Sequence, residues 1–478
     1  MTIAFPERRH ASAATAGSTV RPRHVARLYV PVMAAALIMA PLGAAGAEAK
    51  EPLTAVACGQ MLTHSVRVAN DLTNCPGDGL VIGADAITVD LNGHTIDGDV
   101  TKLEECNVPP FGTAGVNTGG RNGLTIKNGV VQQFGNGVAT GVFANSAQAG
   151  MTDSKLRNLT LRDNRFGGIA LAGDTERTDN NRIEHNVIAD NGCGAGIELH
   201  EAHANHVADN RVSGNATGIL VCCTGSDHNA VENNAIVANQ FEGINVAFGS
   251  DDVIEHNVVS RNGDGGINVC CGEGDQHHVI AYNEVSGNFI GIVLDHADAN
   301  RVTHNHVTGN GDDIGVLGNH NTISDNRISD AVGCPASDPD CGLPGLGIGV
   351  DGGTGNLIAG NAVRRTLGDG IGIAIVADLP AVDNVVRDNR VRDASADGFS
   401  VAPVGDPSVI GTVLERNVAI GSGDDGFDIR SAATTLTANL AVRNGDLGID
   451  AVPGVTDGGD NRAYLNGNPA QCIGVACS

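Results

Sequence analysis

The sequence predicts an all-β solenoid in which about 14 coils of short parallel strands stack on one another. Apolar segments led by glycine recur mostly every 22 to 28 residues, asparagine recurs about every five residues between them, and no segment has a helical period. Aromatic residues make up only 3% of the chain and Trp is absent. Small aliphatic side chains must therefore fill the core.

Residues 1–47 are predicted to be a secretory signal peptide. Arginines precede the 15-residue apolar run LYVPVMAAALIMAPL, and the small residues of GAAGAEA follow it. This order is typical of an exported chain, with cleavage after Ala47 or Ala49. The run is short for a membrane span, although an uncleaved anchor is the alternative. We expect a secreted or cell-surface protein, periplasmic where the host has an outer membrane.

The 12 cysteines are typical of an oxidising compartment, where they pair in disulfides. Three predicted disulfides join cysteines that are close in sequence: Cys58 with Cys75, Cys334 with Cys341, and Cys472 with Cys477. We expect residues 48–79 and 461–478 to be disulfide-closed caps, because the open ends of a solenoid expose unpaired strand edges. The connectivity of the other six stays open: Cys106, Cys193, Cys222, Cys223, Cys270 and Cys271.

Residues 80–460 are predicted to form the solenoid itself, with a looped insertion at 331–346. Ahead of each glycine-led segment, an apolar residue stands three before an asparagine, as in Ile183 and Asn186, and another asparagine follows five later. Because strands of neighbouring coils lie about 4.8 Å apart, these asparagines stack. We interpret them as structural corner residues that adopt the left-handed backbone region and bond to one another along the axis.

The repeat NxIxxNxVxxNxxxGIxL resembles the parallel β-helix repeats of NosD-like proteins, and the segment LVIGADAITVDLNGHTIDG resembles the first coils of that family. The resemblance implies a single-stranded, right-handed parallel β-helix of the pectin-lyase-like superfold. It implies little about chemistry, since this coil serves lyases, hydrolases, epimerases and binding proteins alike. NosD-like proteins are associated with copper-site maturation, which makes metal binding worth testing.

Acidic residues on the last coils form the first candidate site. Aligning SADGFSV, SGDDGFDI and NGDLGIDA stacks Asp424 over Asp446 and Asp428 over Asp450, with Arg430 at the next outward position. Such carboxylates either share a proton, and can act as general acid with nucleophile or base, or bind a hard cation such as Ca²⁺. A further column is a candidate calcium site: Asp369, Asp397 and Asp425.

Two observations oppose catalysis at these aspartates. The segment GDDG resembles the paired aspartates of polygalacturonases, but the motifs GHG and RIK of that class are missing. Aspartate before glycine is also ordinary turn chemistry.

Imidazole, thiol and carboxylate groups form the second candidate site. They follow the glycine-led segments of several coils: His200, Cys222, Cys270, Asp295 and His296. This mixture suits a soft metal, copper or zinc. The competing interpretation is that Cys222 and Cys270, each followed by another cysteine, form vicinal disulfides in an oxidising compartment.

Two classes of function remain. We favour a non-catalytic solenoid that binds an extracellular polysaccharide or a cell-surface glycan. The grooves of sugar-processing enzymes usually stack sugar rings on Trp or Tyr, and this chain has no Trp and only three Tyr. The alternatives are an extracellular polysaccharide lyase, epimerase or hydrolase that uses the stacked aspartates, and a copper-binding protein. A net charge of −26 excludes nucleic acid, and we expect no membrane contact beyond the signal peptide. We expect a monomer.

Overall fold

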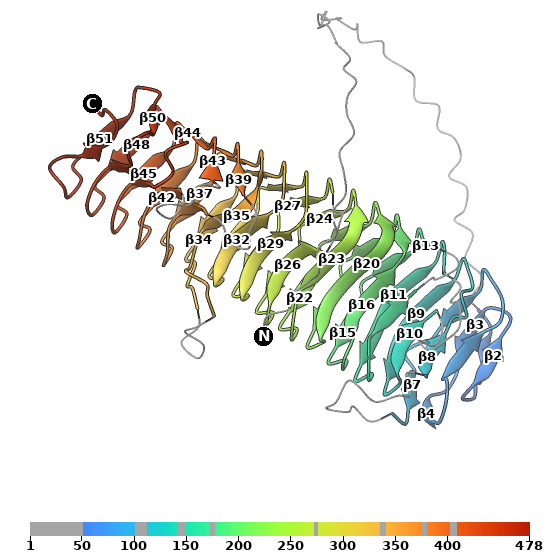
Figure 1. The fold of residues 1–478 in the computed structure, drawn as a ribbon. Helices are drawn as coiled ribbons and strands as arrows, with labels where there is room; N and C mark the ends of the chain where they lie inside the picture. The colour runs from blue at the N-terminus through green and yellow to red at the C-terminus, as the bar shows by residue number, and fades with distance from the viewer. Residues whose placement is uncertain are drawn as a thin grey trace, which may run out of the picture. The chain divides into compact units, whose positions relative to one another are not determined.

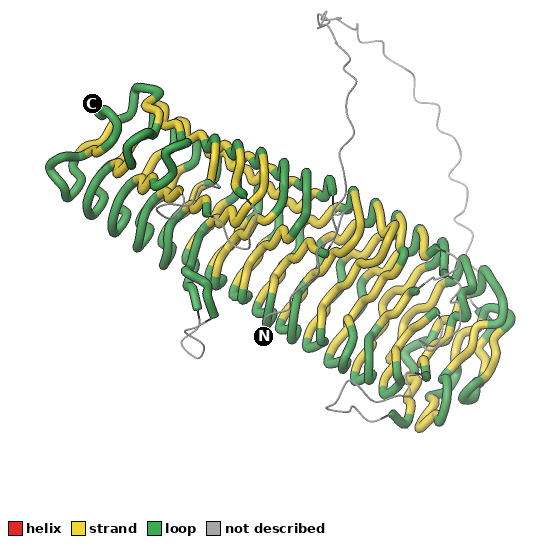
Figure 2. Tube along the Cα trace, viewed as in Figure 1, coloured by secondary structure: helices red, strands yellow, loops and turns green. Residues whose placement is uncertain are grey.

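The structure is a computed structural model that describes residues 51–100, 112–140, 150–172, 177–271, 276–334, 341–374, 380–401 and 409–478. The predicted signal peptide, Cys106 and residues 335–340 of the insertion lie outside these ranges. In the part described, all regular structure is β-strand (Figure 2). No helix there has the length and hydropathy needed to cross a membrane.

The strands lie in three columns, and every strand pairs in parallel with its counterpart on the next coil (Figure 1). About 15 coils stack in this way. The spacing of the corners explains the parallel pairing. A segment of three to five residues is too short to pair with its own coil, so its backbone groups hydrogen-bond to the strands of neighbouring coils. The all-β parallel solenoid is therefore confirmed.

The first column contains β1 (Leu53–Thr54), β3 (Val66–Val68), β6 (Thr88–Asp90), β9 (Thr125–Gln132), β11 (Lys155–Arg162), β14 (Arg182–Glu184), β18 (His206–Ala208), β21 (Ala230–Glu232), β24 (Val253–Glu255), β27 (Val279–Ala281), β30 (Arg301–Thr303), β33 (Thr322–Ser324), β36 (Leu357–Ala359), β40 (Val385–Arg387), β44 (Val413–Glu415), β47 (Thr435–Thr437) and β50 (Thr456–Asp457).

The second column shares the long strands β9 and β11 with the first. It also contains β4 (Leu72–Cys75), β7 (Thr95–Gly98), β15 (Val187–Ala189), β19 (Arg211–Ser213), β22 (Ala235–Val237), β25 (Val258–Ser260), β28 (Glu284–Ser286), β31 (His306–Thr308), β34 (Arg327–Ser329), β37 (Ala362–Arg364), β41 (Arg390–Arg392), β45 (Val418–Ile420), β48 (Leu440–Val442) and β51 (Arg462–Tyr464).

The third column carries the glycine-led segments. It contains β2 (Gln60–Leu62), β5 (Leu80–Ile82), β8 (Ala114–Asn117), β10 (Asn136–Ala139), β12 (Ile169–Leu171), β16 (Ala195–His200), β20 (Thr217–Asp227), β23 (Ile244–Ser250), β26 (Gly265–Cys270), β29 (Ile290–Asp295), β32 (Asp312–Leu317), β35 (Ile348–Thr354), β38 (Ile371–Ile373), β42 (Phe399–Val401), β46 (Phe427–Ile429), β49 (Ile449–Ala451) and β52 (Cys472–Ile473). Four short strands extend this face: β13 (Thr178–Asp179), β17 (Ala202–His203), β39 (Ala381–Val382) and β43 (Val409–Ile410).

The core is a stack of inward-facing aliphatic side chains, as predicted from the composition. Ile219, Ile244 and Ile267 lie in register on successive coils of the third column and are fully buried. Phe399 and Phe427 continue this inward row, and their rings stack with centroids 4.8 Å apart. Alternation along each strand then points the intervening side chains outward, and any functional group on these strands must use those positions.

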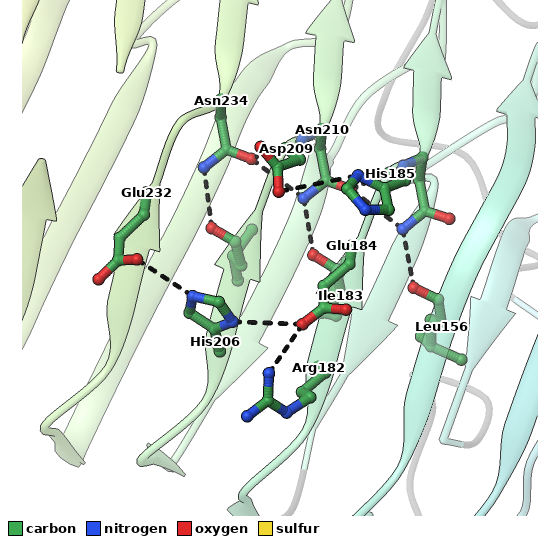
Figure 3. A network of polar contacts seen from close by, with 12 residues as sticks. Leu156, Arg182, Ile183, Glu184, His185, His206, Asp209, Asn210, Glu232 and Asn234 are labelled. Carbon is green, nitrogen blue, oxygen red and sulfur yellow. Dashed lines mark hydrogen bonds and ion pairs between the residues drawn. The ribbon is translucent and has the colours of Figure 1, made fainter. Parts of the chain in front are cut away.

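Asparagine ladders line the corners of the coil. The Asn210 side chain donates through Nδ2 to Asn234 Oδ1 on the next coil at 3.0 Å, and to the Ile183 carbonyl of the preceding coil at 2.8 Å (Figure 3). Its backbone N–H also donates to Asn234 Oδ1. Each buried amide thus satisfies backbone groups on two other coils, and the structural interpretation of the asparagines is confirmed.

One detail of the predicted corner is wrong. The left-handed backbone lies not at the ladder asparagines but at the residue before each of them, with φ of 56 to 58° at His185, Asp209, Asn233, His256, Tyr282 and His304. The ladder asparagine turns its amide into the corner, so the chain reversal falls on the preceding residue. The side chain of that residue is exposed at His185 and Asp209, which contact each other across adjacent coils (Figure 3).

Disulfides close both ends of the described unit and the insertion. The three predicted pairs are present: Cys58–Cys75, Cys334–Cys341 and Cys472–Cys477. Cys193 is also disulfide-bonded. The terminal clamps lie beside β2 and β52, which are the first and last strands of the third column.

Candidate functional site

The outward positions of the third column bring the predicted thiol and imidazole groups onto one face. In register, His200 on β16 pairs with Cys222 on β20, Cys222 pairs with Ala247, and Ala247 pairs with Cys270. Asp295 follows one coil later. The predicted residues therefore share one row, in which His200 with Cys222 and Cys270 with Asp295 are the two pairs of predicted ligands on adjacent coils.

Four side chains meet at the start of this row, and we call them the dithiol cluster: Glu198, His200, Cys222 and Cys223. The Cys223 Sγ lies 3.5 Å from His200 Nδ1, and the opposite ring nitrogen, Nε2, lies 2.6 Å from Glu198 Oε1. His200, Cys222 and Cys223 each offer a ligand atom, and these atoms lie within 4.8 Å of one another. All four residues are partly buried.

The contacts of the dithiol cluster favour a thiolate beside an imidazolium. The hydrogen bonds from Cys222 and from His200 lower the pKa of the Cys223 thiol to about 5. The Cys223 thiolate and burial together raise the pKa of Cys222. Burial opposes the charge of His200, but hydrogen bonds to Cys223 and Glu198 outweigh it and raise the pKa of His200 to about 10. The cluster thus holds one nucleophilic sulfur at neutral pH.

Two predictions about the cysteines are corrected here. Cys222 and Cys223 are free thiols, so the vicinal disulfide expected for them is wrong, whereas the one expected for Cys270 and Cys271 is present. The contacts with the coil below differ, because His200 lies beside the Cys223 sulfur, whereas Cys270 has Ala247 beneath it and the Asn245 amide oxygen 3.7 Å from its sulfur. Because Cys270 is in a disulfide, it has no thiolate to bind a metal, and its prediction as a metal ligand is wrong.

Asp295 and His296 do not join the dithiol cluster. They lie four coils further along the row than His200, and they pair with each other, His296 Nδ1 being 2.6 Å from Asp295 Oδ1. Both are about half exposed. Their contact is that of a surface ion pair, which adds little to stability.

The predicted acidic residues gather on β46, β49 and the turns before these strands, and we call them the acidic cluster: Asp424, Asp425, Asp428, Asp446, Asp450 and Arg430. Asp428 pairs in register with Asp450, as predicted. Two overlapping groups each have carboxylate oxygens within 4.8 Å, one formed by Asp424, Asp425 and Asp446, the other by Asp425, Asp428 and Asp450. Arg430 lies between Asp428 and Asp450. Its Nε is 2.5 Å from Asp428 Oδ1, and its Nη2 is 2.7 Å from Asp450 Oδ2.

Burial raises the pKa of two carboxyl groups of the acidic cluster. Burial raises the pKa of Asp428 to about 6, although Arg430 opposes the shift. Burial likewise raises the pKa of Asp425 to about 6, with repulsion from Asp424 and Asp450 adding to it. A carboxyl group whose pKa is raised toward neutral pH can act as a general acid.

The predicted calcium column stacks as expected, but its carboxylates already have partners. Asp369 Oδ1 accepts the backbone N–H of Asp397 at 3.0 Å, and Asp397 Oδ1 accepts that of Asp425 at 2.8 Å. Asp425 Oδ1 in turn accepts the N–H of Leu447. These aspartates therefore connect successive turns through hydrogen bonds to the backbone. This is the structural role expected of aspartate before glycine.

A family model described as "Periplasmic copper-binding protein (NosD)" matches residues 92–314, and one described as "Right handed beta helix region" matches residues 271–446. The chain is a NosD-like right-handed β-helix protein. No curated protein sequence matches it. The family and the disulfides of this NosD-like protein indicate an extracellular or periplasmic location.

Solved structures resemble the NosD-like protein in fold. The mannuronan C-5 epimerase A-module of Azotobacter vinelandii is 12% identical, with a TM-score of 0.37, covering 84% of this chain and 90% of its own. An alpha-1,3-glucanase catalytic unit from Streptomyces thermodiastaticus is 16% identical, with a TM-score of 0.40, covering 81% and 64%. DFA-IIIase from Arthrobacter chlorophenolicus A6 is 13% identical, with a TM-score of 0.35, covering 69% and 84%.

Glu198 and the role of Cys223 were missed from the sequence. Glu198 stands two residues before His200, and this spacing on a strand places both side chains on one face. That signal was available. Nothing in the sequence shows that Cys223, rather than Cys222, contacts His200, because the choice depends on the positive φ of 81° at Cys223.

Proposed function

We propose that this NosD-like protein is an exported β-helix protein that binds a soft metal ion, Cu(I), at the dithiol cluster. One observation carries the proposal: two free thiols and an imidazole offer ligand atoms within 4.8 Å of one another. In the described residues every cysteine outside this cluster is in a disulfide. A bound metal ion would explain why Cys222 and Cys223 stay reduced while the other described cysteines are oxidised.

The donor set fits copper in its reduced state. Thiolates are soft ligands that select Cu(I) and Zn²⁺, and imidazole suits both metals. Glu198 supplies the outer partner that a metal-bound histidine needs, because it binds His200 Nε2 and so directs Nδ1 toward Cys223. Three protein ligands also suit a zinc ion with an open position, so zinc is the competing occupant.

Export of the chain belongs to the same proposal. Residues 1–47 would act as the signal peptide, and removing them would leave the cluster in a compartment where other thiols are oxidised. A metal bound to Cys222 and Cys223 would protect them there.

The test is metal binding by the purified full-length protein under reducing conditions. We expect one Cu(I) per chain in competition with a Cu(I) chelator, and loss of at least about tenfold in affinity when one ligand is removed in Cys222→Ser or His200→Ala. His206→Ala is the matched control, since His206 contacts Glu184 and Glu232 on the first column and no thiol (Figure 3). Equal Cu(I) affinity in all variants, or tighter binding of zinc than of copper, would reject the copper proposal.

The acidic cluster supports a second candidate function, binding or processing of an extracellular polysaccharide. The supporting observation is the pair Asp428 and Asp450, with Arg430 between them and a pKa of about 6 at Asp428. A protonated Asp428 would serve as general acid, and Asp450 would serve as base or nucleophile. Without turnover, the same groups would hydrogen-bond sugar hydroxyls. Ca²⁺ at Asp369, Asp397 and Asp425 stays a prediction, because one oxygen of each carboxylate accepts a backbone N–H, and a rise in melting temperature on adding Ca²⁺ would test it.

Turnover on a panel of polysaccharides, with and without Ca²⁺, tests this candidate. We expect Asp428→Asn to lower turnover by at least about 100-fold, and the parent activity to fall as pH rises through about 6, because the acid must be protonated. Asp383→Asn, at an exposed corner, is the control. If the parent binds a glycan without converting it, the candidate becomes a lectin-like function. If it does neither, the candidate fails.

A further inference from the structure

The chain carries two copies of one unusual element, a pair of adjacent cysteines at the end of a strand in the third column. Val221-Cys222-Cys223 and Val269-Cys270-Cys271 have the same sequence and lie two coils apart in the same row. The second copy is closed in a vicinal disulfide, and the first is open. The molecule therefore contains both redox states of one element.

The open pair already has the backbone dihedral of the closed pair. The second cysteine of each pair lies in the left-handed region, with φ of 81° at Cys223 and 84° at Cys271. A side chain other than glycine rarely adopts this region without a structural reason. In this row the reason is the corner of the coil, because the corresponding residues Glu201, Phe248 and His296 are also left-handed, with φ of 47°, 61° and 54°. The open pair and the closed pair share this corner and have nearly the same φ, so the backbone of the open pair already suits the closed ring.

Contacts on both sides hold the open pair in place. The Cys222 carbonyl accepts the backbone N–H of Glu201 at 3.2 Å from the preceding coil, and it also accepts the Ser226 hydroxyl. Cys223 is held by the imidazole of His200 at 3.5 Å. Because these contacts fix the backbone and one sulfur, closing the ring requires mainly rotation of side chains.

His200 is the difference between the two copies. A hydrogen bond between a sulfur and an imidazole is strongest when the sulfur is a thiolate, and a disulfide sulfur loses most of it. His200 therefore stabilises the reduced form of Cys222 and Cys223. On the coil below Cys270 and Cys271, Ala247 and the exposed Phe248 offer no hydrogen bond. Asn245 Oδ1 lies 3.7 Å from Cys270 Sγ, but it is a neutral acceptor and cannot donate to a thiolate as an imidazole does.

We propose that Cys222 and Cys223 are a redox-active dithiol that reacts with external disulfides and closes reversibly into a vicinal disulfide. The inference rests on the proposed function in one respect only: closure removes both thiolates and so releases the metal ion. The substrate class is a small or exposed disulfide, R–S–S–R. Cys223 is the attacking residue, Cys222 resolves the intermediate, and His200 is a positioning residue.

The reaction balances without another reagent. The Cys223 thiolate attacks one sulfur of R–S–S–R, which forms a Cys223–S–S–R mixed disulfide and releases R–S⁻. Cys222 loses its proton and attacks Cys223 Sγ, which forms the Cys222–Cys223 disulfide and releases the second R–S⁻. The two protein thiols are oxidised, and the external disulfide is reduced to two thiols after both leaving groups take up protons.

The experiment measures the redox midpoint of each pair in the same molecules. Full-length metal-free protein is equilibrated in buffers of reduced and oxidised glutathione, quenched by alkylation and digested with trypsin. Trypsin places Cys222 and Cys223 in the peptide of residues 212–261, and Cys270 and Cys271 in the peptide of residues 262–301. The alkylated fraction of each peptide then gives the two midpoints by mass spectrometry.

We expect both pairs to change between dithiol and disulfide across the glutathione buffers. Cys222–Cys223 should form its disulfide only at a more oxidising glutathione ratio than Cys270–Cys271. His200→Ala should move the first midpoint toward the second by about tenfold in that ratio, the effect of losing one charge-assisted hydrogen bond. His206→Ala should move neither midpoint. The proposal is overturned if Cys222–Cys223 never closes, if only mixed disulfides with glutathione accumulate, or if His200→Ala leaves the midpoint unchanged.

A second arm separates this inference from the proposed function. Protein loaded with Cu(I) is treated with oxidised glutathione, and released copper is measured alongside the two peptides. Closure with release supports both proposals. Closure in a protein that never bound copper rejects the proposed function and leaves the dithiol reaction standing. Copper binding without closure in the metal-free protein rejects the inference and leaves the metal site standing.

Discussion

At the scale of one residue, Asp313 illustrates what a buried carboxyl group costs this fold. It lies on β32, where it takes the place of the next asparagine in the ladder through Asn288 and Asn310, and it is 0% exposed. Its Oδ1 accepts Asn310 Nδ2 at 2.8 Å, but Oδ2 has no hydrogen-bond partner among the described residues. Burial raises the pKa of Asp313 to about 8, against the hydrogen bonds from Asn310 that lower it.

We predict that Asp313→Asn stabilises the protein at pH 8. The unfolded carboxyl group titrates near about 3.9, so between that pH and about 8 the folded state holds a proton that the unfolded state has lost. The contribution of protonated Asp313 to the free energy of unfolding is fully present below about pH 4 and has been lost once the pH has risen through about 8. Asparagine keeps the Oδ1 acceptor and removes the charge.

Melting temperatures at pH 5 and pH 8 test this prediction. The variant should exceed the parent by several degrees at pH 8, on the order of a few kcal/mol, and by much less at pH 5. Asp153→Asn, at an exposed corner with φ of 53°, should leave the pH dependence of the parent unchanged. Parallel curves for the parent and Asp313→Asn would contradict the prediction.

At the scale of an element, the asparagine ladder is a shared structure whose members depend on their neighbours. Asn234 accepts two hydrogen bonds from Asn210 and donates to Asn257 Oδ1 at 3.1 Å and to the Val207 carbonyl at 2.9 Å. We predict that Asn234→Ala destabilises the protein by about 1 to 3 kcal/mol for each buried group left unpaired. The donors of Asn210 are the first such groups.

Chemical denaturation of Asn234→Ala and of Asn233→Gly checks the prediction. Asn233 precedes the ladder residue, is exposed, and has a φ of 56° that glycine adopts freely. The control should therefore lie close to the parent. If the two variants are equally stable, the amide ladder does not contribute to folding as argued.

The elements also show what the sequence can predict. Repeat spacing was enough to stack Asp428 over Asp450 and to place His200 beside Cys222, because register in a parallel coil follows residue count. It could not show that Arg430 bridges the two aspartates. Nor could it show that Cys222 stays reduced while Cys270 is oxidised, since both results depend on side-chain contacts between coils rather than on spacing.

At the scale of the described unit, each coil contacts only the coils on either side, so stability should be a sum of local terms rather than one global term. Both candidate sites follow this rule, because the dithiol cluster uses β16 and β20 and the acidic cluster uses β46, β49 and the turns before them. A change at one site should therefore not alter the other. The ends are the exception, since an end coil has a neighbour on one side only.

We predict that breaking the C-terminal clamp unravels only the last coils. In a Cys472→Ser, Cys477→Ser variant, hydrogen exchange should accelerate at β49 to β52, where the disulfide holds the final strand against Ile449. Exchange at β23 and β26, in the middle of the stack, should match the parent within error. Breaking Cys334–Cys341, which closes a loop rather than an end, should leave the C-terminal coils protected. A uniform increase across all coils would instead show that the solenoid unfolds as one cooperative unit, and the independence of the two sites would then be lost.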